Sequence, residues 1–179
     1  MQKRLILNAE LFSITVDRLC QQLIEKHGDF SNTVILGLQT KGAVLTDILV
    51  AHLEKLTKLD IKKGYLDTTF YRDDFRRRDT PAKANATKID FLIENKNVIL
   101  VDDVLYTGRS VRAAMDAMLA FGRPDKVELL TLINRKYSRD LPIEPDYVGR
   151  DVNTIESQRV AVQLGDDIQN KVWLVNEEA

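Results

Sequence analysis

Residues 98–110 read VILVDDVLYTGRS and place two adjacent carboxylates, Asp102 and Asp103, shortly before the run TGRS at 107–110. The four apolar residues at 98–101 predict a buried strand, so the aspartates would stand at its carboxyl end, where α/β folds hold their ligands. Adjacent carboxylates repel each other, and burial of an unpaired one is costly. A cation or neutral hydroxyl donors beside the two carboxylates would stabilise them, and a ribose diol with a magnesium ion supplies both.

The run at 107–110 has the residue types of a phosphate site. Its glycine permits close approach of the backbone, its threonine and serine offer hydroxyl donors, and amides at the start of a helix lack partners. Such an arrangement binds a phosphate. Alone, these residues would indicate only a capped helix start after an acidic turn. Beside the aspartate pair, they predict recognition of a ribose 5-phosphate.

Apolar periodicity divides the chain into alternating strands and helices. The expected helices are 9–27, closed by Gly28, a second one that follows a tight turn at 39–42, and 109 to about 121; the expected strands are 33–38, 61–71, 98–101 and 127–133, with short runs at 160–162 and 172–175. Residues 72–88 have the composition of a long charged loop. The pattern predicts one α/β domain over 1–179, with a mostly parallel twisted sheet flanked by helices and a small C-terminal hood from about 135 to 179.

Composition narrows the class of protein. Lys and Arg total 26 against 27 Asp and Glu, so no overall positive field indicates nucleic acid, although a local basic patch is compatible with this balance. The single cysteine, Cys20, lies in an apolar helical pattern and is expected in the core, which favours a reducing compartment. His27 and His52 lie in helical patterns and are expected to have no catalytic role. With no long apolar segment, we expect a soluble, cytoplasmic protein without contact to a membrane.

The segment VILVDDVLYTGRS resembles the phosphoribosyl pyrophosphate (PRPP) signature of the type I phosphoribosyltransferases. Over nearly its whole length the chain is similar to the bifunctional pyrimidine operon attenuation regulators that also carry uracil phosphoribosyltransferase activity, the PyrR family. Further segments that carry the likeness are TTFYRDD at 68–74, RSVRAAMDA at 109–117, GRP at 122–124, LPI at 141–143 and DYVG at 146–149.

The resemblance implies the type I phosphoribosyltransferase fold and a role for each matching residue. Asp102 and Asp103 would engage the ribose hydroxyls and the shell of a Mg²⁺ ion, through water or those hydroxyls, and would be catalytic together with Arg72 of a lid over the substrate. PRPP would be bound at its pyrophosphate by Thr40, Lys41 and Gly42 and at its 5-phosphate by Tyr106, Thr107, Gly108, Arg109 and Ser110. Val104 and Leu105 would also belong to the PRPP site. The base would be bound by Asn134, Arg135 and Val160.

The resemblance also indicates which base is transferred. In the purine-salvage relatives an aspartate precedes the Thr-Gly of the signature, whereas Tyr106 stands there in this chain, as in the pyrimidine branch. The segment NRKYSR at 134–139 departs from the family, which commonly shows Asp-Arg-Gly-His and is one residue shorter. That segment would line the base pocket and border an RNA surface.

Three functions are compatible with these residues. The favoured one is a uracil phosphoribosyltransferase that binds PRPP, uracil and UMP or UTP as a homo-oligomer, a dimer or larger, with an additional role in binding pyrimidine operon mRNA. The alternatives are a nucleotide-sensing RNA-binding regulator with weak turnover and a purine phosphoribosyltransferase. A phosphoacceptor signalling domain is excluded, because residues 33–39 offer no second aspartate at a strand end. The helix at 9–27 has only Arg18 and Lys26 as cations, which weakens the prediction of RNA binding.

Overall fold

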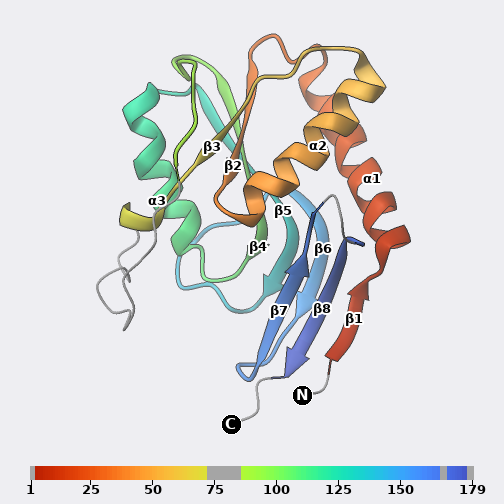
Figure 1. Cartoon of the computed structure of the whole chain (residues 1–179). Coiled ribbons are helices and arrows are strands. Elements are labelled where there is room, and N and C mark those ends of the chain that lie inside the picture. The colour runs from red at the N-terminus through yellow and green to blue at the C-terminus, as the bar shows by residue number, and fades with distance from the viewer. Residues whose placement is uncertain (1–2, 72–85, 166–168, 177–179) are drawn as a thin grey trace.

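The computed structural model describes residues 3–71, 86–165 and 169–176 (Figure 1). In chain order its elements are β1 (Lys3–Leu7), α1 (Ala9–His27), β2 (Thr33–Leu38), α2 (Lys41–Thr57), β3 (Lys63–Leu66), the 3-10 turn η1 (Thr69–Tyr71), β4 (Asn97–Leu105), α3 (Arg109–Met118), the 3-10 turn η3 (Leu119–Phe121), β5 (Lys126–Lys136), β6 (Tyr147–Asn153), β7 (Gln158–Gln163) and β8 (Lys171–Asn176). No helix within these ranges is long and apolar enough to cross a membrane.

The main sheet has five parallel strands in the order β3-β2-β4-β5-β6. Helices α1 and α2 cover one face of this sheet and α3 covers the other (Figure 1). The predicted α/β class with a parallel sheet flanked by helices is therefore confirmed. In β4, Ile99 and Val101 pack in the cluster that contains α1 and α2, whereas Val98 and Leu100 pack in the cluster that contains α3. Because both faces are covered, the strand reads as an unbroken apolar run.

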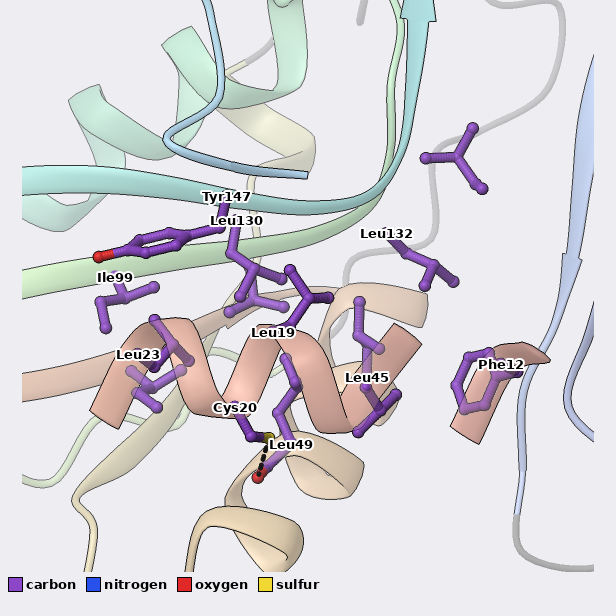
Figure 2. Packing of buried hydrophobic residues seen from close by; sticks show 14 of the residues in the cluster. Phe12, Leu19, Cys20, Leu23, Leu45, Leu49, Ile99, Leu130, Leu132 and Tyr147 are labelled. Atoms are coloured by element: carbon purple, nitrogen blue, oxygen red, sulfur yellow. Dashed lines mark hydrogen bonds between the residues drawn. The ribbon is translucent and has the colours of Figure 1, made fainter. Parts of the chain in front are cut away.

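The larger core lies between α1, α2 and the sheet (Figure 2). Leu19 and Leu23 of α1 are completely buried there, beside Leu49 of α2. Cys20 is buried among them, and its thiol donates a weak hydrogen bond to the Leu49 carbonyl oxygen at 3.7 Å. Burial, assisted by the charge of Asp17, raises the pKa of the Cys20 thiol to about 12. The predicted core position of this cysteine is confirmed.

A second, smaller sheet is antiparallel and has the order β1-β8-β7. The short runs expected in the C-terminal hood form β7 and β8, but β1, near the start of the chain, completes the sheet by pairing with β8 (Figure 1). Strand β6, which also follows residue 135, belongs instead to the main parallel sheet. The hood therefore combines segments from both ends of the sequence.

Two strands differ from the lengths that the sequence predicts. The expected strand 61–71 is only four residues long, β3, because the Asp67 carboxylate accepts hydrogen bonds from the backbone N–H and hydroxyl of Thr69 at 3.0 and 2.6 Å and turns the chain. β4 continues beyond Val101, since it stays paired with β5 as far as Leu105 opposite Asn134. Asp102 and Asp103 thus lie within the last residues of a strand. Of the expected loop 72–88, residues 72–85 lie outside the described ranges.

A buried acidic group occupies the amino edge of the sheet. The Glu128 carboxylate is 1% exposed and lies 2.9 Å from Lys26 Nζ and 2.7 Å from Lys126 Nζ. It also accepts a hydrogen bond from the Tyr147 hydroxyl at 2.5 Å and lies 3.1 Å from His27 Nε2. His27 therefore belongs to a structural network at the edge of the sheet opposite the carboxyl ends of the strands.

Candidate functional site

Three turns meet at the carboxyl edge of the main sheet, after β2, β4 and β5. Between β4, the start of α3 and β5 lies a cavity of about 240 Å³, lined by Asp102, Val104, Leu105, Tyr106, Thr107, Gly108, Ser110, Val111 and Arg135. Eight of these nine residues belong to the continuous stretch from Asp102 to Val111. The structure thus brings Asp102 to the same cavity as Thr107, Gly108 and Ser110 of the TGRS run.

Asp102 and Asp103 differ in their surroundings although they are neighbours in the chain. Consecutive side chains of a strand point to opposite faces of the sheet, and Asp102 lines the cavity whereas Asp103 does not. The Asp102 carboxylate accepts a hydrogen bond from the backbone N–H of Asp103 at 2.9 Å. Burial raises the pKa of Asp103, and the positive charge of Lys41 opposes that rise. The pair therefore presents one carboxylate to the cavity and one to the start of α2.

The turn after β2 approaches β4 because two glycines leave room for it. A Cβ on Gly42 would lie 2.4 Å from the Val101 carbonyl oxygen, and one on Gly37 would lie 2.5 Å from Thr46 Oγ1. Gly37 pairs with Val101 in the parallel register, which places the residues after β2 beside the end of β4. Thr40 makes no side-chain cap at the start of α2, and Lys41 is exposed there. The turn thus holds a cation and the amides of a helix start beside the aspartates, a combination suited to an anion.

The turn after β4 has the backbone form that its glycine allows. Gly108 has a φ of +90°, in the region that favours glycine, and precedes the first residue of α3. The Thr107 hydroxyl accepts a hydrogen bond from the backbone N–H of Arg109 at 3.4 Å. The Arg109 guanidinium lies 3.0 Å from the Asp140 carboxylate, so it is held beside the turn by an acidic neighbour. Thr107 and Ser110 both line the cavity.

The residues expected to meet the base are not all found together. Arg135 lines the cavity, and its guanidinium carbon lies 3.7 Å from the centre of the Tyr106 ring. Asn134 is 2% exposed and is held by other side chains: it donates to the Asp151 carboxylate at 2.8 Å and accepts a hydrogen bond from Arg139. Val160 lies in β7, packed against the larger core, and does not line the cavity. Arg72, expected to be catalytic, lies outside the described residues.

The sequence placed Arg139 in the segment 134–139, expected to line the base pocket, but gave it no role of its own; in the structure Arg139 lies behind the turn after β4. Its guanidinium donates to the carbonyl oxygens of Leu105, Tyr106, Arg135 and Ile143. Arginines that bind several carbonyls in this way do not show a spacing motif, because their partners come from distant parts of the chain. The only signal in the sequence was a cation inside the segment that departs from the family pattern.

The described residues contain no cluster of three or more His, Cys, Asp or Glu side chains that could hold a metal ion. The two carboxylates of Asp102 and Asp103 are compatible with Mg²⁺ all the same. This ion keeps several waters and is commonly bound through one or two carboxylates together with phosphate oxygens of a substrate. Asp102 and Asp103 would hold it in that manner.

Comparison with known proteins gives the same assignment for most of the chain. A family model described as a phosphoribosyl transferase domain matches residues 4–169. The chain is 46% identical over 161 residues to the bifunctional protein PyrR of Gloeothece citriformis, covering 89% of each protein. It is 44% identical over 163 residues to the bifunctional protein PyrR of a Synechocystis species, covering 90% of this chain and 89% of that protein.

A solved structure supports the fold independently. The hypoxanthine phosphoribosyltransferase of Trypanosoma cruzi has a TM-score of 0.71 at 14% sequence identity, covering 98% of this chain and 97% of that chain. At this identity the likeness shows the fold alone. Together with the two relatives, it confirms the resemblance that the signature segment indicates and extends it to both sheets. The chain is a type I phosphoribosyltransferase and belongs to the family of the bifunctional PyrR proteins.

Proposed function

We propose that the protein transfers the phosphoribosyl group of PRPP to uracil, giving UMP and pyrophosphate in a reaction that requires Mg²⁺. The observation that carries the proposal is the position of the two turns that are expected to bind anions. The turn at 106–110 and the turn at 40–42 lie on either side of the end of β4, where Asp102 and Asp103 stand. A ribose with a phosphate at its 5-position and a pyrophosphate at its anomeric carbon has its charges in the same order.

Each part of the site has a distinct task in this proposal. The backbone N–H groups of the turn at 106–108 bind the 5-phosphate, and Asp102 and Asp103 orient the ribose hydroxyls. Lys41 and the amides at the start of α2 stabilise the charge that gathers on the departing pyrophosphate. Asp102 and Asp103 would hold a Mg²⁺ ion, which would neutralise part of that charge. Displacement at the anomeric carbon passes through a cation-like sugar, so exclusion of water by the bound base protects that species from hydrolysis.

The choice of uracil rests on Tyr106. This residue replaces the aspartate that handles a proton on the purine ring in purine-salvage relatives, and its ring is stacked under Arg135. The position just before Thr107 therefore has no carboxylate that could exchange a proton with the ring of a 6-oxopurine. Uracil requires little from a side chain, because backbone amides and carbonyls can hydrogen-bond with its edge. Several structural neighbours are named as hypoxanthine phosphoribosyltransferases, but at 14–19% identity they share only the fold with this chain.

Labelled uracil incubated with the protein, PRPP and Mg²⁺ tests this function. We expect labelled UMP, and we expect Asp103→Asn to lower the rate by orders of magnitude because the carboxylate beside Lys41 is lost. Asp125→Asn is a suitable control, since Asp125 is an exposed aspartate just before β5, at the opposite edge of the sheet. Turnover of hypoxanthine or guanine without turnover of uracil would show that the base is wrong.

We propose a second function, the binding of pyrimidine operon mRNA under the control of UMP or UTP, because the relatives at 40–46% identity are named bifunctional. Two cations of α1 are engaged within the protein: Arg18 donates to the carbonyl oxygens of Val148 and Gly149, and Lys26 pairs with Glu128. A gel-shift assay with the leader of the protein's own pyrimidine operon should show uridine-nucleotide-dependent binding. Equal binding to an unrelated RNA would count against regulation. The homo-oligomeric state is part of the same proposal and can be measured by light scattering.

A further inference from the structure

The back of the turn that follows β4 is covered by a short segment from residue 139 to 141. The Tyr106 carbonyl oxygen accepts a hydrogen bond from Arg139 Nη1 at 2.6 Å, and the Leu105 carbonyl oxygen lies 3.4 Å from the same nitrogen. The Thr107 carbonyl oxygen accepts from the backbone N–H groups of Asp140 and Leu141 at 3.0 and 3.1 Å. Three consecutive carbonyls, of Leu105 at the end of β4 and of Tyr106 and Thr107 in the turn, therefore point toward this segment.

The direction of these carbonyls fixes the direction of the amides that follow them. A trans peptide unit is planar and places its C=O and N–H on opposite sides, and the cis bonds among the described residues are confined to Gln39–Thr40. With the carbonyls of Tyr106 and Thr107 held at the back, the N–H groups of Thr107 and Gly108 point away from that segment. Within the described ranges neither N–H group has a hydrogen-bond partner, and both residues line the cavity.

The guanidinium of Arg139 is itself fixed from several directions. Nε donates to the Ile143 carbonyl oxygen at 2.9 Å, and Nη1 also donates to the Arg135 carbonyl oxygen at 3.0 Å. Nη2 donates to the side-chain oxygen of Asn134, which is anchored in turn by Asp151. A planar guanidinium can serve this many acceptors at once, whereas an ammonium offers three donors on a single atom. Its permanent positive charge also lies directly behind the turn.

From this geometry we infer that Arg139 is a positioning residue that holds the turn at 106–108 in its phosphate-binding form, with the amides of Thr107 and Gly108 directed at the 5-phosphate. The inference rests on the proposed function, and it adds a residue outside the signature segment to the binding of the 5-phosphate. Arg139 acts through the backbone of the turn and through its charge, not by contact with the substrate. The pyrophosphate end of the site, at Thr40 to Gly42, does not depend on it.

The independence of the two ends gives a test that distinguishes positioning from a general effect on folding. Calorimetry on the full chain measures the binding of ribose 5-phosphate and, separately, of pyrophosphate with Mg²⁺. We expect Arg139→Gln to weaken ribose 5-phosphate about ten- to a hundredfold, because the carbonyls lose their charged donor, and to change pyrophosphate binding less than about twofold. Arg139→Lys keeps the charge and some of the hydrogen-bond donors, so its affinity for ribose 5-phosphate should lie between those of the wild type and Arg139→Gln.

Arg18→Lys is the matched control, since Arg18 also donates to two backbone carbonyls but joins α1 to β6. It should leave both ligands unaffected. In steady-state assays Arg139→Lys should raise KM for PRPP more than KM for uracil. Equal weakening of both ligands would show a general structural role, and unchanged binding of ribose 5-phosphate would show that the turn holds its form without Arg139; either result overturns the inference. If the wild type binds neither ligand, the proposed function itself fails.

Discussion

The close approach of α2 to β4 makes Gly42→Ala the sharpest test of how the site is built. A Cβ at this position would lie 2.4 Å from the Val101 carbonyl oxygen and 3.2 Å from Asp102 Cα, whereas ordinary contact begins at 3.4 Å. Both neighbours are backbone atoms of a central strand that is paired on each side, so they cannot turn aside as a flexible side chain would. The start of α2 must therefore move away from β4 by about 1 Å, the difference between the ordinary and the imposed contact.

A displacement of this size should affect activity more than stability. The movement carries Lys41 and the amides of the turn away from Asp103 and from the pyrophosphate, and a misplacement of about 1 Å in a catalytic arrangement can cost about 100-fold in rate. Overpacking of this kind lowers the free energy of unfolding by about 1–3 kcal/mol. We expect kcat/KM for PRPP to fall about 100-fold in Gly42→Ala, in a protein that still unfolds cooperatively in urea.

Gly149→Ala provides a steric control of equal severity. A Cβ on Gly149 would lie 2.3 Å from the Leu132 carbonyl oxygen, but this glycine is in β6, outside the residues that line the cavity. It should lose stability to a similar degree and keep kcat/KM near the wild-type value. The reasoning is refuted if both variants lose activity equally, or if Gly42→Ala is as active as the wild type.

Three further predictions concern groups whose pKa the fold changes. Burial alone would raise the pKa of Glu128, but hydrogen bonds from Lys126, Tyr147 and Lys26 and the charge of His27 lower it from 4.5 to about 2. A carboxyl whose pKa is lower in the folded state stabilises the folded protein above pH 4.5 and loses that contribution as the pH falls toward 2. In urea titrations at matched protein concentration, Glu128→Gln should therefore lower the free energy of unfolding by about 3 kcal/mol at pH 7 and by progressively less below pH 4.5. A difference that does not change with pH would contradict this. Because burial raises the pKa of Asp103, its ionised form opposes folding, and Asp103→Asn should increase the midpoint of thermal unfolding at pH 7 while it removes activity. The Cys20 thiol, whose pKa is raised to about 12, should react with iodoacetamide in the folded protein far more slowly than in urea, and rapid labelling without unfolding would place it outside the core.

The parts of the fold that sequence patterns predict are those set by neighbours in the chain. The apolar run of β2 followed by the glycine turn predicts a strand and a helix, and the structure has both, with all six residues of β2 buried. The signature segment likewise predicts a strand, a glycine turn and a helix, because Gly108 and the amphipathic pattern of α3 are local signals. The family assignment, which depends on this segment, is confirmed by the relatives.

The parts that could not be predicted depend on contacts between distant residues. β1 is a strand because it pairs with β8, which comes last among the elements, and the five residues KRLIL are too few to show by themselves whether they form a strand or lead into α1. Asn134 was expected to face the base only because its position matches a base-binding position of the family. In the structure its side-chain amide donates a hydrogen bond to Asp151 and accepts one from Arg139. The direction of a side chain at the end of a strand depends on the partners that later segments supply. Here they are Arg139, 5 residues away between β5 and β6, and Asp151, 17 residues away in β6.

The position of β4 in the centre of the sheet explains why so short a segment can organise the whole site. β2 pairs with one side of β4 and β5 with the other, so the turn after β2 and the segment after β5 both arrive beside its last residues. Gly42 brings the turn after β2, the proposed pyrophosphate end, against Val101 and Asp102, and Arg139 donates a hydrogen bond to the Tyr106 carbonyl oxygen behind the turn after β4, the proposed phosphate end. Gly42 and Arg139 follow opposite neighbours of β4. Substitution of either residue should therefore weaken the binding of one end of PRPP and leave the binding of the other end unchanged. A site held together by the signature segment alone would lose both ends at once.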